Sequence, residues 1–200
     1  DLSLTDGDSG FLWPDSEGGA DLSAIGGPTY QANSLNGYPT VLYDGTDDAH
    51  EGAFASTLTQ PDYIVAALQI EGTGDNPAER IWSSNDLNEL QIFGVSSGSN
   101  NDFLAFAGSS LVGGPVYDNN PHIAGVNYNG ASTAIRYDGS EVATGDAGTN
   151  DLPGFRLGSD PDGTDSGNFR VGEVLHLDSP SASDITDAES YLSEKWGITI

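Results

Sequence analysis

Short β-branched and aromatic runs alternate with tight-turn sequences along this chain, and this alternation constrains the fold more than any other feature. Asp44-Gly45, Asn129-Gly130 and Asp138-Gly139 each close such a run. Asn-Gly and Asp-Gly favour hairpins because both residues tolerate the positive φ that a two-residue turn requires. Turn signals recur roughly every 8–12 residues, a spacing typical of β-sandwiches. We therefore predict an all-β fold.

The most apolar run identifies the centre of the predicted sheets. Residues 63–70 read Tyr-Ile-Val-Ala-Ala-Leu-Gln-Ile, so we expect a central strand there. Residues enriched in strands also fill eight further runs, namely 39–43, 80–83, 89–95, 102–107, 122–128, 134–137, 155–157 and 169–177.

One helix is predicted near the end of the sequence. Thr186 and Glu189 have the spacing of a capping box, in which each side chain binds a free backbone N–H at the start of a helix. Gly197 suits the position just after a helix. Residues at helical spacing between them form one face: Ala188, Tyr191, Leu192 and Lys195 or Trp196. We expect Tyr191 and Trp196 to pack over an edge or open end of the sandwich.

The charge balance excludes several classes of partner. The chain has 31 acidic and 5 basic residues, with a net charge of −26. Nucleic acids and anionic membranes both require patches of Lys and Arg, so neither is expected to bind. Self-repulsion on this scale is relieved in concentrated salt, where the screening length falls to about 3 Å at 1 M. The composition favours a halophilic source, with a marine or calcium-rich extracellular protein as the alternative.

The chain has no apolar run of about 18 residues, so no membrane insertion is predicted. It contains no cysteine or methionine and begins at Asp1. We interpret it as a mature fragment or a domain of a longer protein. The expected location is extracellular, on a cell or virion surface in a high-salt environment.

Four segments carry a resemblance to a known superfamily. Residues 191–197 read Tyr-Leu-Ser-Glu-Lys-Trp-Gly after a strand at 172–175, residues 35–48 end in Asp-Gly-Thr-Asp-Asp, and residues 136–142 contain an Asp-Gly hairpin. This arrangement resembles the laminin-G-like branch of the concanavalin A-like lectin/glucanase superfamily. The resemblance implies a single domain over residues 1–200. It also implies a jelly-roll β-sandwich of two antiparallel sheets with one short C-terminal helix.

Catalytic patterns are missing from the sequence. The superfamily's glucanases carry carboxylates at alternate positions of one strand. The nearest pair here is Glu173 and Asp178, whose positions differ by an odd number. Such residues face opposite sides of a regular strand. There is no cysteine, no G-x-S-x-G elbow and no histidine pair at zinc-ligand spacing. We therefore predict no catalytic residues and no enzyme.

Two acidic loops are candidate calcium sites, since calcium prefers oxygen ligands. The first contains Asp44, Asp47 and Asp48. The second contains the other candidate ligands, Asp160, Asp162 and Asp165. The alternative for both is a solvated turn whose aspartates accept hydrogen bonds from their own backbone.

Trp13, Tyr38, Trp82 and Tyr117 lie beside turn residues and are the candidates for stacking on sugar rings, with core packing as the alternative. We predict a non-catalytic binding or adhesion module that recognises a surface glycan or peptide through loops at one end of the sandwich. The alternative is a structural or decoration domain bound to neighbouring chains of a larger assembly.

Overall fold

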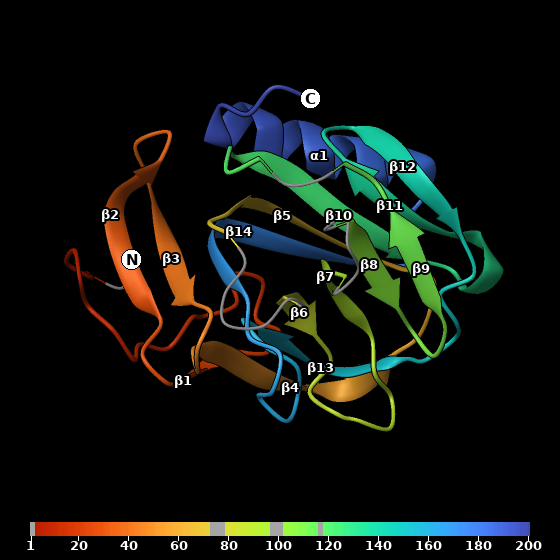
Figure 1. Cartoon of the computed structure of the whole chain (residues 1–200), viewed down its shortest axis with the longest axis horizontal. Helices are drawn as coiled ribbons and strands as arrows, with labels where there is room; N and C mark the ends of the chain where they lie inside the picture. The colour runs from red at the N-terminus through yellow and green to blue at the C-terminus, as the bar shows by residue number, and fades with distance from the viewer. Residues whose placement is uncertain (1–2, 73–78, 97–101, 116–117) are drawn as a thin grey trace.

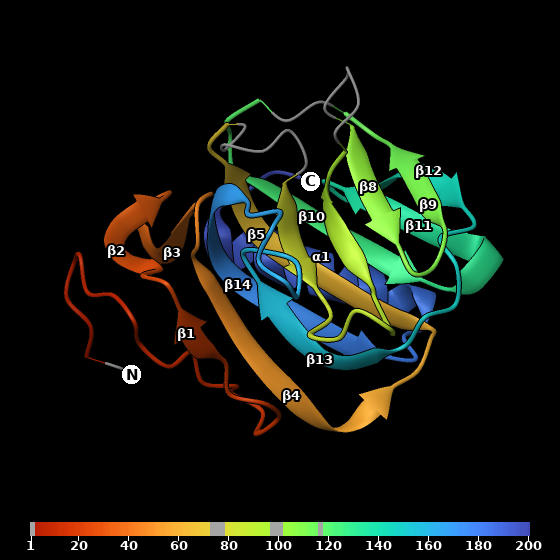
Figure 2. The same cartoon turned by 60° about the horizontal axis from the view of Figure 1, so that its bottom comes forward.

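The computed structural model describes residues 3–72, 79–96, 102–115 and 118–200. These residues form two seven-stranded antiparallel sheets and one C-terminal helix (Figures 1 and 2). The predicted all-β sandwich with a single helix at its C-terminal end is confirmed.

Sheet A carries the helix on its outer face. Its strands, in spatial order, are β12 (Ser140–Gly145), β11 (Thr133–Tyr137), β10 (His122–Tyr128), β5 (Asp62–Ile70), β14 (Asn168–Asp178), β3 (Tyr38–Asp44) and β2 (Thr29–Leu35). A 3₁₀ turn, η1 (Gly130–Ser132), joins β10 to β11.

Sheet B covers the inner face of sheet A. Its strands, in spatial order, are β1 (Ser23–Ile25), β4 (Ala49–Leu58), β13 (Leu152–Leu157), β6 (Arg80–Ser83), β7 (Ile92–Val95), β8 (Phe103–Phe106) and β9 (Ser110–Gly113).

Strand β5 lies inside sheet A, between β10 and β14, as its apolar run predicts. Ile64 and its alternate neighbours pack against sheet B in the main core. Tyr63 and its alternate neighbours pack against the helix in a second core. Burial on both faces explains why the run has almost no polar side chains.

Helix α1 (Ala182–Trp196) begins one turn earlier than the sequence predicts. Ser181 and Asp184 form the capping box that the prediction placed at Thr186 and Glu189. Thr186 is inside the helix, where its hydroxyl donates to the carbonyl of Ala182. The helix ends at Gly197, which has φ of 62° as predicted for this position.

Helix α1 packs one face on sheet A through Ile185, Ala188, Leu192 and Trp196. Tyr191 does not join this face, because its ring is 46% exposed. In the described part of the chain no helix is both long and apolar enough to span a membrane.

Candidate functional site

A cleft of about 750 Å³ opens along one edge of β14. This strand pairs with β3 only over residues 168–171, and a bulge follows at Gly172. Beyond the bulge, β14 continues beside β5 alone among the described strands. Residues 172–177 therefore form an open sheet edge that lines the cleft.

One wall of the cleft is aromatic and aliphatic. Trp13 and Leu22 exchange two backbone hydrogen bonds of 2.8 Å, which hold the N-terminal segment beside sheet B. The Trp13 indole meets the ring of His50 edge-on, with 5.7 Å between ring centroids. Further apolar side chains of this wall come from β4 and β13, namely Phe54, Phe155 and Leu157.

His176 lines the cleft, and the carboxylate of Asp62 lies buried behind it. Asp62 is fully buried, and its Oδ1 accepts a 3.2 Å hydrogen bond from Gln91 Nε2. Its Oδ2 lies 3.6 Å from His176 Nε2, and neither atom has a hydrogen-bond partner among the described residues. The ring of His176 stacks on Phe54 at an interplanar angle of 10°.

His176 presents part of its imidazole to the cleft. Nε2 is buried, yet 21% of the side chain is exposed and the residue lines the cleft. A proton on Nε2 would point toward the Asp62 carboxylate, which leaves Nδ1 as an acceptor. Nδ1 of His176 can therefore accept a hydrogen bond from a hydroxyl group bound in the cleft.

The opposite wall of the cleft is charged and comes from β14 and α1. Glu173 accepts hydrogen bonds from Trp196 Nε1 and Lys195 Nζ, each at 2.9 Å. Burial lowers the pKa of Lys195, but its hydrogen bonds to Tyr191 and Glu173 raise it overall. The wall also carries Asp184 and Asp187 from the helix.

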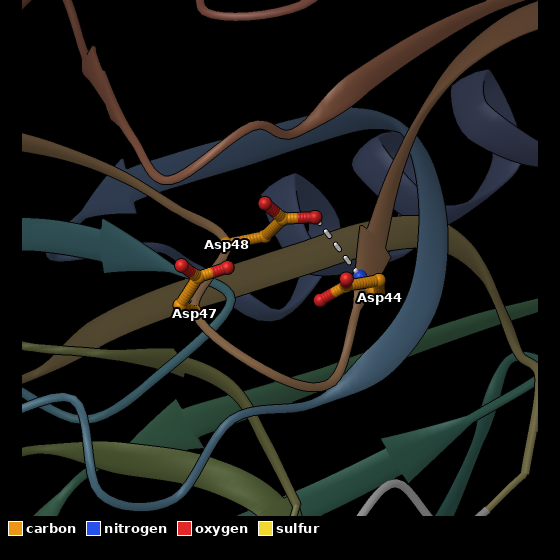
Figure 3. Close-up of side chains that lie close together, drawn as sticks. All are labelled: Asp44, Asp47 and Asp48. Carbon is orange, nitrogen blue, oxygen red and sulfur yellow. Dashed lines mark hydrogen bonds between the residues drawn. The ribbon is translucent and has the colours of Figure 1, made fainter.

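The first acidic loop brings its three predicted ligands together at the end of β3 (Figure 3). One carboxylate oxygen from each of Asp44, Asp47 and Asp48 lies within 4.8 Å of the others. Asp48 is buried and accepts backbone hydrogen bonds from Gly27 (2.7 Å) and Asp44 (3.1 Å). Burial raises the pKa of Asp48, against the lowering effect of these two bonds.

This loop fits an oxygen-liganded cation in its donor set, since Asp47 and Asp44 are exposed and their carboxylates stand beside that of Asp48. The loop also has a feature of the alternative, a turn whose aspartates accept hydrogen bonds from their own backbone, because Asp44 Oδ1 accepts from the backbone N–H of Thr46 at 2.8 Å. Calcium at this loop stays a prediction.

The second acidic loop divides its carboxylates between two partners, because Asp160 and Asp162 converge on Thr164 while Asp165 binds Arg80. Asp165 Oδ2 accepts from Arg80 Nη2 at 2.6 Å. Asp160 and Asp162 accept instead from the backbone N–H of Thr164, at 2.9 and 3.1 Å. Among the described residues, the acidic side chains that lie close enough together to hold a metal ion are Asp44, Asp47 and Asp48. No residue of the second loop belongs to this group.

The three candidate aromatic residues in the described part of the chain have different surroundings. Trp13 lines the cleft. Tyr38 is 46% exposed at the start of β3, with its ring against Trp196. Trp82 is fully buried against Phe93, so its indole offers no surface to a ligand. Tyr117 lies outside the described residues.

Sequence reasoning missed Phe54, His176 and Asp62 as site residues. The available signal was weak: His176 interrupts the apolar side chains of β14 that face the other sheet. Glu173 and Asp178 pair with Ala67 and Asp62, so they do face opposite sides, as their odd spacing predicts.

No family model matches the sequence, and no curated protein matches it. Solved structures do match the fold. Trypanosoma rangeli sialidase, in complex with the inhibitor DANA, is 13% identical with a TM-score of 0.65. The match covers all of this chain (100%) and 33% of the sialidase chain.

Two further matches cover more of the compared protein. Domain 4 of AbnA, a GH43 extracellular arabinanase from Geobacillus stearothermophilus, was solved with arabinotriose and is 13% identical with a TM-score of 0.60. That match covers 92% of this chain and 98% of the domain. A GH54 α-L-arabinofuranosidase is 15% identical with a TM-score of 0.56, over 98% of this chain and 48% of that enzyme.

At these identities the likeness shows a shared β-sandwich fold. It is compatible with the predicted superfamily at that coarse level. The chain spans about a third of the sialidase and about half of the arabinofuranosidase.

The comparisons contradict the predicted function. A non-catalytic adhesion module, or a decoration domain, was expected from the missing carboxylate pattern. The similar structures instead belong to glycoside hydrolases, so the prediction of no enzyme is contradicted too. Local motifs within one sequence do not decide between these classes, because one fold can carry both catalytic and non-catalytic functions.

Proposed function

We propose that this chain is a domain of a carbohydrate-active enzyme and that it holds an oligosaccharide in the cleft along β14. The observation that carries the proposal is the pairing of an aromatic wall with polar side chains in one cleft. Binding sites for small molecules combine these two features. A sugar ring has apolar C–H faces and polar hydroxyl edges, so it matches both.

The aromatic wall would bury one face of a sugar. Trp13 and Phe54 are both partly exposed and both line the cleft. Burying apolar area gains about 25 cal/mol per Å². A Trp ring adds little conformational cost, because only two side-chain torsions are involved.

The polar side of the cleft would orient the hydroxyl groups. His176 offers Nδ1 as an acceptor while Asp62 holds the other side of its ring. Exposed carboxylates such as Asp187 are further acceptors. Each satisfied hydrogen bond contributes about 0.5–1.5 kcal/mol, which is enough to set orientation.

The compared structures support a glycan as the ligand. The arabinanase domain, which matches this chain over nearly its full length, was solved with arabinotriose. An arabinofuranosidase that is 17% identical was solved with arabinofuranosyl-α-1,2-xylobiose. A saccharide ligand is therefore part of the proposal, and the identity of the sugar is left to the experiment.

Three finer assignments accompany this proposal. The C-terminal Tyr-Leu-x-x-Lys-Trp-Gly segment supports the laminin-G-like branch of the superfamily. The net charge of −26 supports an extracellular, high-salt environment. The carboxylates at Asp44, Asp47 and Asp48 support a calcium ion that stabilises the turn after β3.

The test is calorimetric titration of the chain in molar salt with a panel of oligosaccharides that includes arabinotriose. Release of reducing sugar is measured on the same panel, so that turnover is detected as well as binding. Trp13→Ala should weaken binding at least tenfold, and His176→Ala should weaken it severalfold. Tyr38→Ala is the matched control, since this exposed aromatic lies outside the cleft lining and its variant should bind normally.

Circular dichroism confirms that each variant is folded. The proposal is abandoned if the folded wild-type chain neither binds nor cleaves any member of the panel. It also fails if Tyr38→Ala loses binding while Trp13→Ala retains it, because the site would then lie elsewhere.

A further inference from the structure

We infer that the cleft selects saccharides without acidic groups, and that a free amino group on the sugar strengthens binding. This inference rests on the proposed function and specifies its substrate class. It excludes uronic acids, sialic acids and sulfated sugars as the preferred ligands. The selectivity follows from where the few basic groups of the chain lie.

Proteins hold a sugar carboxylate or sulfate with Arg or Lys, whose charge and donors match the anion. The chain has five such side chains, and all of them lie in the described residues. Each is already in an ion pair, at 2.6–2.9 Å: Arg80–Asp165, Arg136–Glu189, Arg156–Glu51, Arg170–Glu71 and Lys195–Glu173.

Of these five side chains, Lys195 is the one that lines the cleft. Its ammonium group lies 2.9 Å from Glu173 and 2.8 Å from the hydroxyl of Tyr191. An anionic sugar bound to Lys195 would lie beside the Glu173 carboxylate, whose negative charge offsets that of the ammonium group. The lysine therefore does not act as an anion receptor.

The histidines do not supply a free positive charge either. His50 is buried, and burial lowers its pKa, so it stays neutral. His122 lies 2.7 Å from Asp138 and 2.9 Å from Asp118. Protonated His176 would face the buried Asp62 carboxylate at 3.6 Å, which would cancel its charge.

The cleft itself is lined by carboxylates that lack a cationic partner in the described structure. Asp184 accepts from Ser181, and Asp15 accepts from the backbone of Glu17. Glu17 and Asp187 are exposed and form no ion pair with any described residue. Their combined field repels an anion and attracts an ammonium group.

Salt changes this discrimination in a predictable way. The screening length is about 10 Å at 0.1 M and about 3 Å at 1 M. Repulsion of an acidic sugar should therefore be strongest at the lowest salt at which the chain stays folded. Binding of a neutral sugar should hardly depend on salt.

The experiment is a glycan array that carries neutral oligosaccharides beside their uronic acid, sialylated, sulfated and free-amino counterparts. It is run with chelator present, so that no bound cation bridges an acidic sugar to the carboxylates. We expect binding to neutral and amino forms, with the amino form at least threefold tighter than its N-acetylated counterpart at low salt. Acidic forms should bind at least tenfold more weakly than their neutral cores.

A charge variant tests the cause. Glu17→Gln combined with Asp187→Asn should reduce, about threefold at low salt, the ratio of the affinity for a neutral sugar to the affinity for its acidic form. Glu194→Gln is the control, because this exposed acid is on the same helix but outside the cleft lining.

The outcomes separate the two proposals. An acidic glycan that binds more tightly than its neutral core overturns the inference and leaves carbohydrate binding intact. The inference is also overturned if the double variant and Glu194→Gln behave alike. If the folded chain binds no glycan of any class, the proposed function itself fails.

Discussion

Gly172 of β14 lies directly beneath the indole of Trp196, so closely that a Cβ atom at residue 172 would overlap the ring. This contact is at the bulge where β14 separates from β3 and where the open edge of the cleft begins. Gly172, which has no side chain, therefore lies both in the contact with α1 and at the start of the open edge.

Gly172→Ala should lower the free energy of unfolding by about 1–3 kcal/mol, since the added methyl group must displace the indole. Denaturant unfolding in molar salt measures the change. Gly27→Ala is the control, because the nearest atom to its added Cβ is 3.8 Å away. Equal effects of the two substitutions would mean that the indole moves aside at no cost.

Glu189 forms the buried connection between α1 and sheet A. It is 2% exposed and binds Arg136 Nε at 2.7 Å and the Tyr63 hydroxyl at 2.8 Å. Glu189→Ala should cost about 3–5 kcal/mol, because it breaks a largely buried ion pair and leaves the exposed Glu141 as the carboxylate partner of Arg136. Glu141→Gln removes the exposed partner of the same arginine and should cost less than about 1 kcal/mol. A Glu189→Ala variant as stable as Glu141→Gln would contradict this assignment.

His122 should make stability depend on pH. Burial lowers the pKa of His122, but its hydrogen bonds to Asp138 and Asp118 raise it overall, above 6.5. The hydrogen bond from His122 in turn lowers the pKa of Asp118 to about 2. The folded state thus binds a proton on His122 more tightly than the unfolded state does.

The sign of this effect follows from linkage. Stability from His122 is fully present below pH 6.5 and is lost as pH rises through the raised pKa. The difference in unfolding free energy between wild type and His122→Gln should therefore shrink from pH 6 to pH 8. A difference that grows over this range would show that His122 is neutral in the folded chain.

Calcium should stabilise the chain through the loop after β3. A concentration 100-fold above the dissociation constant adds about 2.7 kcal/mol to the free energy of unfolding. Asp47→Asn should abolish most of this gain, because Asp47 is exposed and its change leaves the backbone hydrogen bonds of Asp48 in place. Asp162→Asn, in the other acidic loop, is the comparison. Thermal unfolding with calcium or chelator checks both, and identical curves for wild type would rule out the site.

Local patterns predicted much of the strand arrangement. The apolar run at 63–70 is β5, and the turn at Asp138-Gly139 joins β11 to β12 with positive φ at both residues. Strand β4 was missed, because its sequence Ala-His-Glu-Gly-Ala-Phe-Ala-Ser-Thr-Leu lacks a regular alternation. Strand β4 forms by pairing with β1 and β13, and neither partner is next to β4 in the sequence.

Sequence reasoning can predict that side chains lie together in space only where they are close together in the sequence. Asp44, Asp47 and Asp48 are within one turn, so their proximity in space follows from local geometry. Trp13, Phe54 and His176 come from three distant segments, and no local pattern relates them. The predicted non-catalytic function is contradicted by the comparisons; it was inferred from a fold resemblance and from missing local motifs, neither of which identifies residues that only the tertiary structure brings together.

The sequence alone determined the β-sandwich class, the central strand, the C-terminal helix and a surface that repels anions. These properties depend on hydrophobic periodicity, turn residues and net charge, which are all set by the order and number of residues. Only the tertiary structure decided where β14 loses its neighbour, that Asp62 lies behind His176, and that every lysine and arginine has an acidic partner. Those relationships join residues far apart in the sequence, 105 positions in Arg156–Glu51 and more in His176–Asp62, and they exist only once the sheets have packed.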